Sequence, residues 1–184
     1  MNKSIKLHIA CGKEKPNKRR IFQFIKVTKQ KCVASDGIIL AVVPTSVVFS
    51  EEFISQIPES GFLLHAKDYK KLLKYDSAIL KLCGCIIHMT GVKKRVSVIQ
   101  VFKESEIGAF PKWESSVPSL NNLKRELKKS TCIDAKLLHR LQKSLGILNS
   151  HLIFFEGRSP IEVEPATVGE NNALGILSTI HRQN

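Results

Sequence analysis

The chain has 184 residues, of which 43% are hydrophobic, so it can bury the core of one ordinary domain or two small ones. Lysine and arginine number 29 against 16 acidic residues, and the net charge of +13 favours a polyanionic partner, chiefly nucleic acid. No apolar run approaches the length of a membrane helix and no signal-peptide pattern follows Met1, so we expect a cytoplasmic protein with no membrane partner.

The N-terminal third predicts strands. Residues 5–10 alternate loosely and favour a first strand, which a basic, Pro-broken connection separates from a β-rich run. In that run Asp36-Gly37 lies between apolar, β-branched residues, and this pair is a strong hairpin signal because Gly accepts a positive φ. We therefore expect three consecutive antiparallel strands over residues 21–43.

The next segment predicts a two-faced helix. A short helical turn at residues 50–57 and a strand at residues 61–65 precede a helical pattern over residues 66–76. Its apolar side carries Tyr69, Leu72 and Leu73. Its other side carries four lysines at helical spacing: Lys67, Lys70, Lys71 and Lys74. Three strands, at residues 78–82, 86–90 and 96–102, complete the order β, α, β, β, β.

The C-terminal third repeats this order. After a Pro-bounded connector and a possible basic helix over residues 120–129, a short strand at 131–133 leads to Asp134, a suitable N-cap. The predicted helix, residues 135–145, again has a cationic side, and Gly146 is a sensible stop. Strands are expected at residues 151–155, 160–164 and 174–180. The cationic residues of this helix are Lys136, Arg140 and Lys143.

No motif of an enzyme or a metal site is complete. The sequence has no nucleophile elbow, no Gly-rich phosphate loop and no HExxH pair, so we expect no catalytic residues. Cys83-Gly84-Cys85 with His88 is the one metal candidate, but a fourth zinc ligand is not evident. A turn between two strands accounts equally well for the Cys-Gly-Cys pattern. We expect no metal and no cofactor. The odd number of scattered cysteines favours reduced thiols.

Three segments, in the same order as in the family, resemble the bacterial sliding clamp, the beta subunit of the replicative DNA polymerase. Residues 34–42, Ala-Ser-Asp-Gly-Ile-Ile-Leu-Ala-Val, are similar to its Ala-Thr-Asp-Gly-His-Arg-Leu-Ala-Val signature. Residues 110–118 resemble its Phe-Pro-Asp-Tyr connector. We expect Trp113, the sole tryptophan, to anchor this connector rather than to stack on a base. Residues 160–180 resemble its last strands.

The resemblance implies an α+β, DNA-clamp-like fold of βαβββ repeats, with antiparallel sheets and basic amphipathic helices on one face. It implies a clamp-like domain with a degenerate first half at residues 1–118 and a partial one, a single βαβββ unit, at residues 119–184. A full clamp subunit is about twice this long, so most of a first domain is absent.

The resemblance also implies function. The basic helices would face double-stranded DNA without reading its sequence, in replication or repair, as a processivity factor or polymerase accessory, with a ring-forming homo-oligomer as one arrangement. A second site would bind peptides of polymerases or other clamp-binding proteins. Its positions here are Gly37, Leu40, Pro111, Ser115, Ser116, Ile176, Leu177 and Ile180.

Two alternatives stay open from the sequence. One is a clamp mimic or adaptor that forms no ring and captures clamp-interacting proteins through the apolar pocket. The other is a general nucleic-acid-binding protein, RNA included, because A-form backbone also attracts basic faces.

Overall fold

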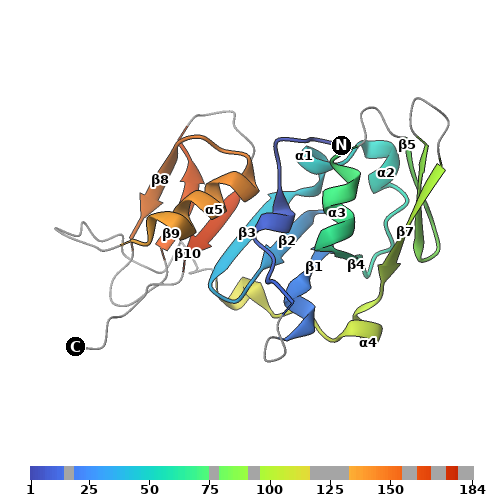
Figure 1. Cartoon of the computed structure of the whole chain (residues 1–184), viewed down its shortest axis with the longest axis horizontal. Coiled ribbons are helices and arrows are strands. Elements are labelled where there is room, and N and C mark those ends of the chain that lie inside the picture. The colour runs from blue at the N-terminus through green and yellow to red at the C-terminus, as the bar shows by residue number, and fades with distance from the viewer. Residues whose placement is uncertain are drawn as a thin grey trace.

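The computed structural model describes residues 1–14, 19–74, 79–90, 96–116, 133–154, 161–166 and 173–177. Within these residues, all strands join one antiparallel sheet in the order β5-β6-β7-β4-β1-β2-β3-β10-β9-β8 (Figure 1). The C-terminal strands therefore continue the sheet of the N-terminal part through the pairing of β3 with β10.

The strands are β1 (Phe24–Val27), β2 (Lys31–Ser35), β3 (Ile39–Pro44), β4 (Phe62–His65), β5 (Ile79–Cys83), β6 (Ile86–Thr90), β7 (Val96–Phe102), β8 (Ser150–Ile153), β9 (Ile161–Pro165) and β10 (Leu174–Leu177). The α-helices are α1 (Thr45–Val48), α2 (Glu51–Ile54), α3 (Ala66–Leu72), α4 (Glu104–Ile107) and α5 (Ala135–Leu145). The 3-10 helices are η1 (Leu7–Ile9), η2 (Arg20–Gln23) and η3 (Trp113–Ser116).

The predicted hairpin is confirmed. Strands β2 and β3 pair from Lys31 with Pro44 to Ser35 with Leu40, and Gly37 in the turn has a φ of 89°. The Asp36 carboxylate accepts hydrogen bonds from the backbone N–H groups of Ile38 and Ile39, at 2.9 and 3.0 Å. The side chain thus closes the turn from within, as Asx turns do.

The first predicted β, α, β, β, β unit is confirmed as β4, α3, β5, β6 and β7. The second is confirmed from α5 through β8, β9 and β10, while its first strand falls mostly outside the described residues. The possible helix at residues 120–129 and the boundary between residues 118 and 119 also lie outside them.

Two predictions near the N-terminus are wrong. Residues 5–10 form no strand but contain the short helix η1 at Leu7–Ile9, and residues 21–23 belong to η2, so β1 begins only at Phe24. The physical reason is tertiary. Ile5 and Leu7 are fully buried because η1 packs between α3 and α5, so this segment fills the space between two helices and does not join the sheet.

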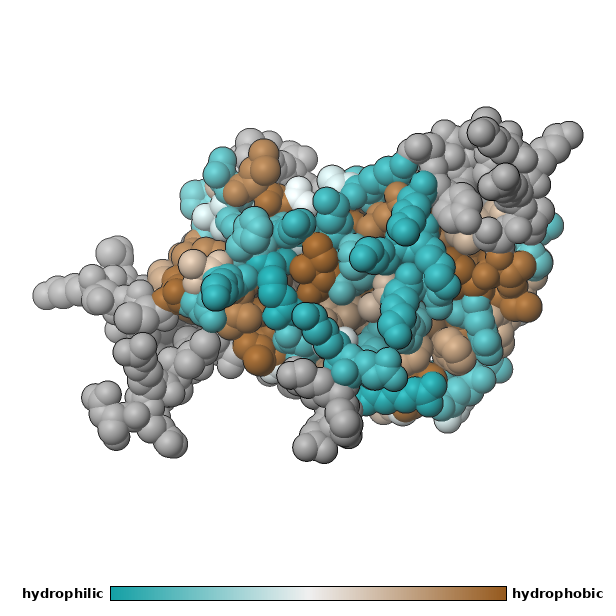
Figure 2. Space-filling model, in the orientation of Figure 1, coloured by the Kyte–Doolittle hydropathy of each residue, from teal (hydrophilic) through white to brown (hydrophobic). Residues whose placement is uncertain are grey.

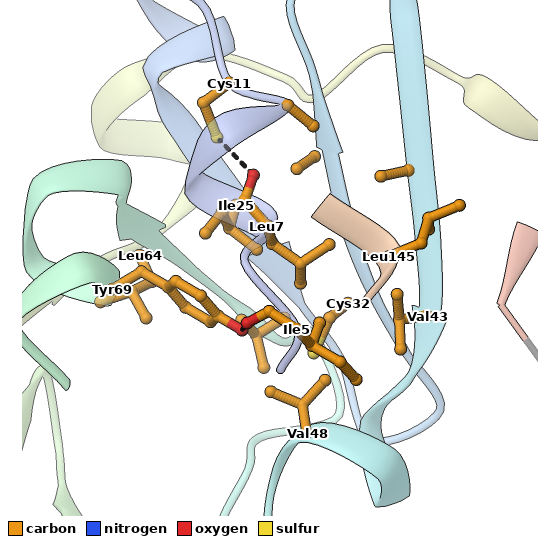
Figure 3. Close-up of a cluster of buried hydrophobic side chains, with 14 of the residues drawn as sticks. Ile5, Leu7, Cys11, Ile25, Cys32, Val43, Val48, Leu64, Tyr69 and Leu145 are labelled. Carbon is orange, nitrogen blue, oxygen red and sulfur yellow. Dashed lines mark hydrogen bonds between the residues drawn. The ribbon is translucent and has the colours of Figure 1, made fainter. Parts of the chain in front are cut away.

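The sheet has an apolar cluster on each face. On β3, Ile39 and Val43 belong to the cluster under the helices, which includes Tyr69 of α3 and Leu145 of α5 (Figure 3). The alternate residue Leu40 joins a smaller cluster on the opposite face. This alternation explains why the strand reads as a continuous apolar run, since both of its faces are covered.

None of the helices in the described residues is long and apolar enough to cross a membrane.

Candidate nucleic-acid interface

Helix α3 is held by its apolar side and by its N-cap. The His65 ring accepts a hydrogen bond from the Lys67 backbone N–H through Nδ1 at 3.1 Å. Tyr69 and Leu72 are buried, and the Tyr69 hydroxyl donates to the Ile5 carbonyl at 3.1 Å (Figure 3). Burial raises the pKa of Tyr69, so this hydroxyl stays protonated and remains a donor.

The four predicted lysines of α3 and its C-terminal end are exposed, as the helical pattern requires. Two of them have acidic partners: Lys67 pairs with Glu14 at 3.3 Å, and Lys71 pairs with Asp68 at 2.6 Å. Lys70 and Lys74 form no ion pair with any residue that the structure describes. These two ammonium groups therefore have no described carboxylate to compete with a polyanion.

Helix α5 is built in the same way. Asp134 caps its N-terminus by accepting from the backbone N–H of Lys136 at 2.8 Å, and Gly146 ends it at a φ of 71°. Leu141 and Leu145 are fully buried against the sheet. Lys136 and Lys143 are exposed, and neither pairs with an acid in the described part of the chain.

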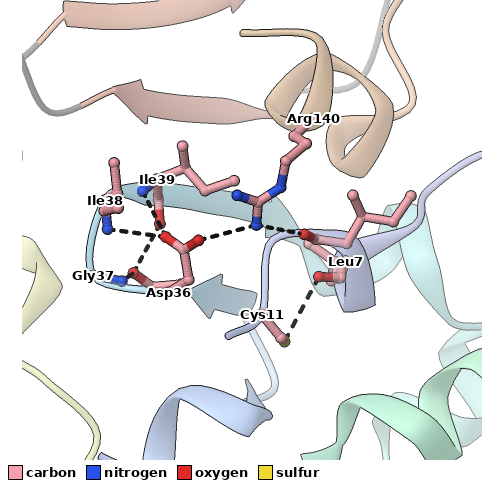
Figure 4. Close-up of polar contacts among 9 residues, drawn as sticks. Leu7, Cys11, Asp36, Gly37, Ile38, Ile39 and Arg140 are labelled. Atoms are coloured by element: carbon pink, nitrogen blue, oxygen red, sulfur yellow. Dashed lines mark hydrogen bonds and ion pairs between the residues drawn. The ribbon is translucent and has the colours of Figure 1, made fainter. Parts of the chain in front are cut away.

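Arg140 differs from the other cationic residues of α5. Its guanidinium donates to the Asp36 carboxylate and to the Ile9 carbonyl, both at 3.0 Å, so it points to the protein (Figure 4). Burial alone would raise the pKa of Asp36, but the N–H groups of Ile39 and Ile38 and the charge of Arg140 lower it overall. Helical spacing alone grouped Arg140 with the lysines, and no local pattern in the sequence predicts its ion pair with Asp36.

Helices α3 and α5 lie on the same face of the sheet with η1 between them (Figure 1). Figure 2 shows hydrophilic side chains gathered across the middle of this face. The structure thus brings the two lysine sets of the sequence prediction onto one side of the molecule. We call the exposed residues Lys70, Lys74, Lys136 and Lys143 the lysine face.

Sequence reasoning missed a hollow in this face, between η1, α3 and Arg140. His8, Lys13 and Gln23 line it together with the start of α3. The misread strand at residues 5–10 concealed this grouping, because the compact turn of η1 brings His8 to the start of α3. No local signal in the sequence marks it.

The predicted peptide-site residues are brought together only in part. Leu40 and Ile176 face each other across β3 and β10 and share the smaller apolar cluster with Phe110. All three are nearly buried, and Pro111, next to Phe110, is half-buried. Trp113 packs on the same cluster under the Lys31 ammonium, 4.9 Å from its ring centre, so it anchors the connector as predicted.

The other members of that set lie elsewhere. Leu177 belongs to the cluster on the helix side, since it alternates with Ile176 along β10. Gly37 is in the hairpin turn, where an added Cβ would meet the Phe22 ring at 3.6 Å. Ser115 and Ser116 end η3, and Ile180 lies outside the described residues.

The four cysteines in the described part of the chain are isolated thiols. Cys11, Cys32, Cys83 and Cys85 are all free, and Cys83-Gly84-Cys85 forms the expected turn between β5 and β6. Burial raises the pKa of Cys32 to about 12, which keeps this thiol protonated and unreactive. Within the described residues, no three His, Cys, Asp or Glu side chains gather in a way that would hold a metal.

No protein-family model and no curated protein matches the sequence. Solved structures do match. The DNA polymerase sliding clamp from Pseudomonas aeruginosa superposes with a TM-score of 0.64 at 12% identity over 98% of this chain and 64% of that one. The clamp from Bacillus subtilis gives 0.65 at 10% identity over 96% and 60%. The DNA polymerase III beta subunit from Thermotoga maritima gives 0.59 at 14% identity over 96% and 63%.

At these identities the comparison establishes the fold alone, and the chain spans less than two thirds of the length of these clamps. The α+β class and the clamp-like repeats predicted from the sequence are confirmed. Almost the whole of this chain has the fold of a bacterial DNA polymerase sliding clamp.

Proposed function

We propose that this protein binds duplex DNA without sequence preference, as a clamp-like processivity factor or polymerase accessory in replication or repair. The observation that carries the proposal is the lysine face: helix α3 with the turn that follows it, and helix α5, present four exposed lysines with no described acidic partner on one side of one sheet. Lysine side chains on rigid helices suit phosphate contacts, which give affinity without base readout. The role is one of binding and requires no catalytic residue.

The expected affinity is electrostatic and salt-dependent. Each phosphate contact that releases a counterion contributes about 0.9 to the slope of log affinity against log salt. Four contacts from the lysine face therefore predict a slope of about 3.6, to which Lys67 and Lys71 add only when they exchange their carboxylates for phosphates. Arg140 adds little directly because Asp36 and Ile9 already hold its guanidinium.

Charge reversal on each helix tests the proposal. The test variants are Lys70→Glu with Lys74→Glu, and Lys136→Glu with Lys143→Glu. The matched control is Lys81→Glu with Lys112→Glu. It changes net charge equally but acts away from the lysine face. Lys81 alternates with Leu80 and Leu82, which pack on the helix-side cluster, and Lys112 follows Phe110 of the smaller cluster by two residues.

The measurement is binding of a blunt DNA duplex across a salt series. We expect each test variant to weaken binding by at least tenfold and to lower the salt slope by about 2, the contribution of two contacts. The control should retain the slope. Equal losses in the test and control variants would show that net charge alone attracts DNA and would refute the helix-face proposal. Competition with single strands and RNA then measures the preference for duplex DNA.

Encircling DNA would require more than one copy of this chain. The described sheet ends in β5 on one side and β8 on the other, and each of these strands pairs on one side only. Edge strands present unpaired backbone groups that a second copy can use. We propose a homo-oligomer on this basis. A strict monomer at micromolar concentration, by mass measurement, would exclude a ring and leave ordinary DNA binding intact.

A second function, capture of clamp-binding proteins, is supported by one contact. Leu40 and Ile176 lie opposite each other on the face away from the helices, and Ile38, beside them in the turn, is 42% exposed. We propose that an apolar peptide docks at this end of the β3–β10 pair. Calorimetry with a clamp-binding peptide tests it, and Ile38→Asp should abolish the binding without disturbing the core. If Ile38→Asp leaves the peptide affinity unchanged, the peptide does not bind at this end of the β3–β10 pair.

A further inference from the structure

The hollow in the lysine-bearing face has a volume of about 680 Å³. Ile9, Cys11 and Gly12 from the N-terminal segment and Ala66 from α3 contribute apolar parts of its lining. Small-molecule sites in proteins have volumes in this range and combine apolar walls with a few polar groups. The hollow is therefore large enough for a ligand with a flat ring.

The rim of the hollow is cationic. Four basic side chains line it, but Glu14 pairs with Lys67 and Asp36 pairs with Arg140. Lys13 and Lys70 have no ion pair with a described residue. Two positive charges thus remain without a carboxylate among the described residues, which favours a ligand that carries a phosphate.

Two imidazoles also line the hollow. Burial, with the nearby charges of Lys70 and Lys6, lowers the pKa of His8, and burial lowers that of His65. Both rings are therefore mainly neutral near pH 7. The enclosed Nδ1 of His8 has no hydrogen-bond partner within the described residues. A neutral ring offers a flat face on which a heterocycle can stack.

We propose that this hollow binds a single nucleotide, with its phosphate at Lys13 and Lys70 and its base between the apolar lining and the imidazole of His8. The inference deepens the proposed DNA-binding function, because DNA on the lysine face would bring an unpaired nucleotide to the hollow. A paired base would first have to leave its stack, which costs free energy, so an unpaired end is the favoured source within DNA.

Calorimetric titration with deoxyadenosine monophosphate tests the site directly. Deoxyribose 5-phosphate and inorganic phosphate serve as controls that lack the base. Because stacking on a base adds to affinity, we expect the nucleotide to bind at least about fivefold more tightly than either control. Binding no tighter than that of the two controls would reveal only an anion site and overturn the proposal.

Three variants localise the ligand. Ala66→Leu enlarges a side chain in the hollow without changing the charge, and Lys70→Gln removes a rim charge. Lys74→Gln is the matched control, since it removes the same charge from the end of the same helix but does not line the hollow. We expect the first two to weaken nucleotide binding about fivefold or more, and the third to leave it unchanged. Equal effects of Lys70→Gln and Lys74→Gln, or no effect of Ala66→Leu, would refute the site.

Blunt duplex binding by the same variants separates this inference from the proposed function. Lys70→Gln and Lys74→Gln should weaken duplex binding alike, whereas Ala66→Leu should not change it. A duplex with an unpaired end then identifies the source of the nucleotide. If the protein binds this duplex more tightly than the blunt one, and Ala66→Leu removes the difference, the nucleotide in the hollow comes from DNA. Nucleotide binding without such a preference supports the same site with a free nucleotide as its ligand.

Discussion

Arg140 on α5 donates a hydrogen bond to the carboxylate of Asp36 in the β2–β3 turn, at 3.0 Å, although 104 residues separate them in the chain (Figure 4). The same guanidinium holds the Ile9 carbonyl, and the same carboxylate closes the hairpin. The Arg140 guanidinium therefore joins α5 to the turn by an ion pair and to the N-terminal segment by a hydrogen bond. It supplements the β3–β10 pairing, which joins the two parts of the sheet.

We predict that Arg140→Gln and Asp36→Asn each lower the free energy of unfolding by about 1–2 kcal/mol, the usual range for a hydrogen bond to a charged group when one partner is partly exposed. Asn at position 36 retains an oxygen for the Ile38 and Ile39 N–H groups, so its effect isolates the bond to Arg140. A double-mutant cycle by urea unfolding gives the coupling. A coupling near zero would mean that the two side chains contribute independently.

We predict that Arg140→Gln weakens duplex binding less than Lys143→Gln does. Both variants lose one positive charge, but only Lys143 presents an exposed ammonium without a described acidic partner. The two should share the long-range loss and differ in the salt slope, which only Lys143→Gln lowers by about 0.9. The same duplex titration across salt measures both. If Arg140→Gln lowered the salt slope more than Lys143→Gln, Arg140 would have to contact DNA directly.

Most of the fold follows from local patterns in the sequence. The hairpin at Asp36-Gly37, the two helices with their caps and the three strands after α3 all have signals within a few residues of themselves. The N-terminal segment does not. Ile5 and Leu7 alternate as a strand would, yet their burial depends on two helices far along the chain.

The candidate site was also predictable where it depends on local sequence and not where it depends on distant residues. Helical spacing identifies the exposed lysines, because exposure on an amphipathic helix is a local property. It does not separate Arg140 from Lys143, since the partner of Arg140 is distant in sequence. Strand alternation likewise separates Leu177 from Ile176, so the peptide-site residues inferred from the clamp resemblance divide between the two faces of the sheet.

We predict that Tyr69→Phe lowers the free energy of unfolding by about 1–2 kcal/mol. The substitution removes only the hydroxyl, which donates to the Ile5 carbonyl at 3.1 Å in a fully buried setting, and leaves that carbonyl without this donor. Thermal and urea unfolding measure the loss. Duplex binding at a temperature well below the transition should be unchanged, since Tyr69 faces the core. A neutral effect on stability would show that the carbonyl finds another partner.

We predict that stability falls as the pH falls below about 6.5, because the pKa values of His8 and His65 are lower in the folded protein than in the unfolded chain. The unfolded state then binds more protons, so the stabilisation is complete above pH 6.5 and is lost as the pH falls through the folded pKa values. His65→Asn retains a capping acceptor for Lys67 but does not titrate. Its stability should depend less on pH between 7.5 and 5 than that of the unsubstituted protein. Identical pH profiles would exclude His65 as a source.

Gly61 and Gly84 provide a matched test of backbone constraint. Both have a positive φ, 68° and 57°, so alanine at either position costs about 1–2 kcal/mol in backbone strain. At Gly61 an added Cβ would also lie 2.4 Å from the Val27 carbonyl oxygen, whereas at Gly84 it would meet nothing within 4 Å. We predict that Gly61→Ala destabilises the protein by at least about 2 kcal/mol more than Gly84→Ala, because β4 must move away from β1 to relieve the contact. Urea unfolding of the two variants measures the difference, and equal losses would mean that the chain before β4 relaxes without cost.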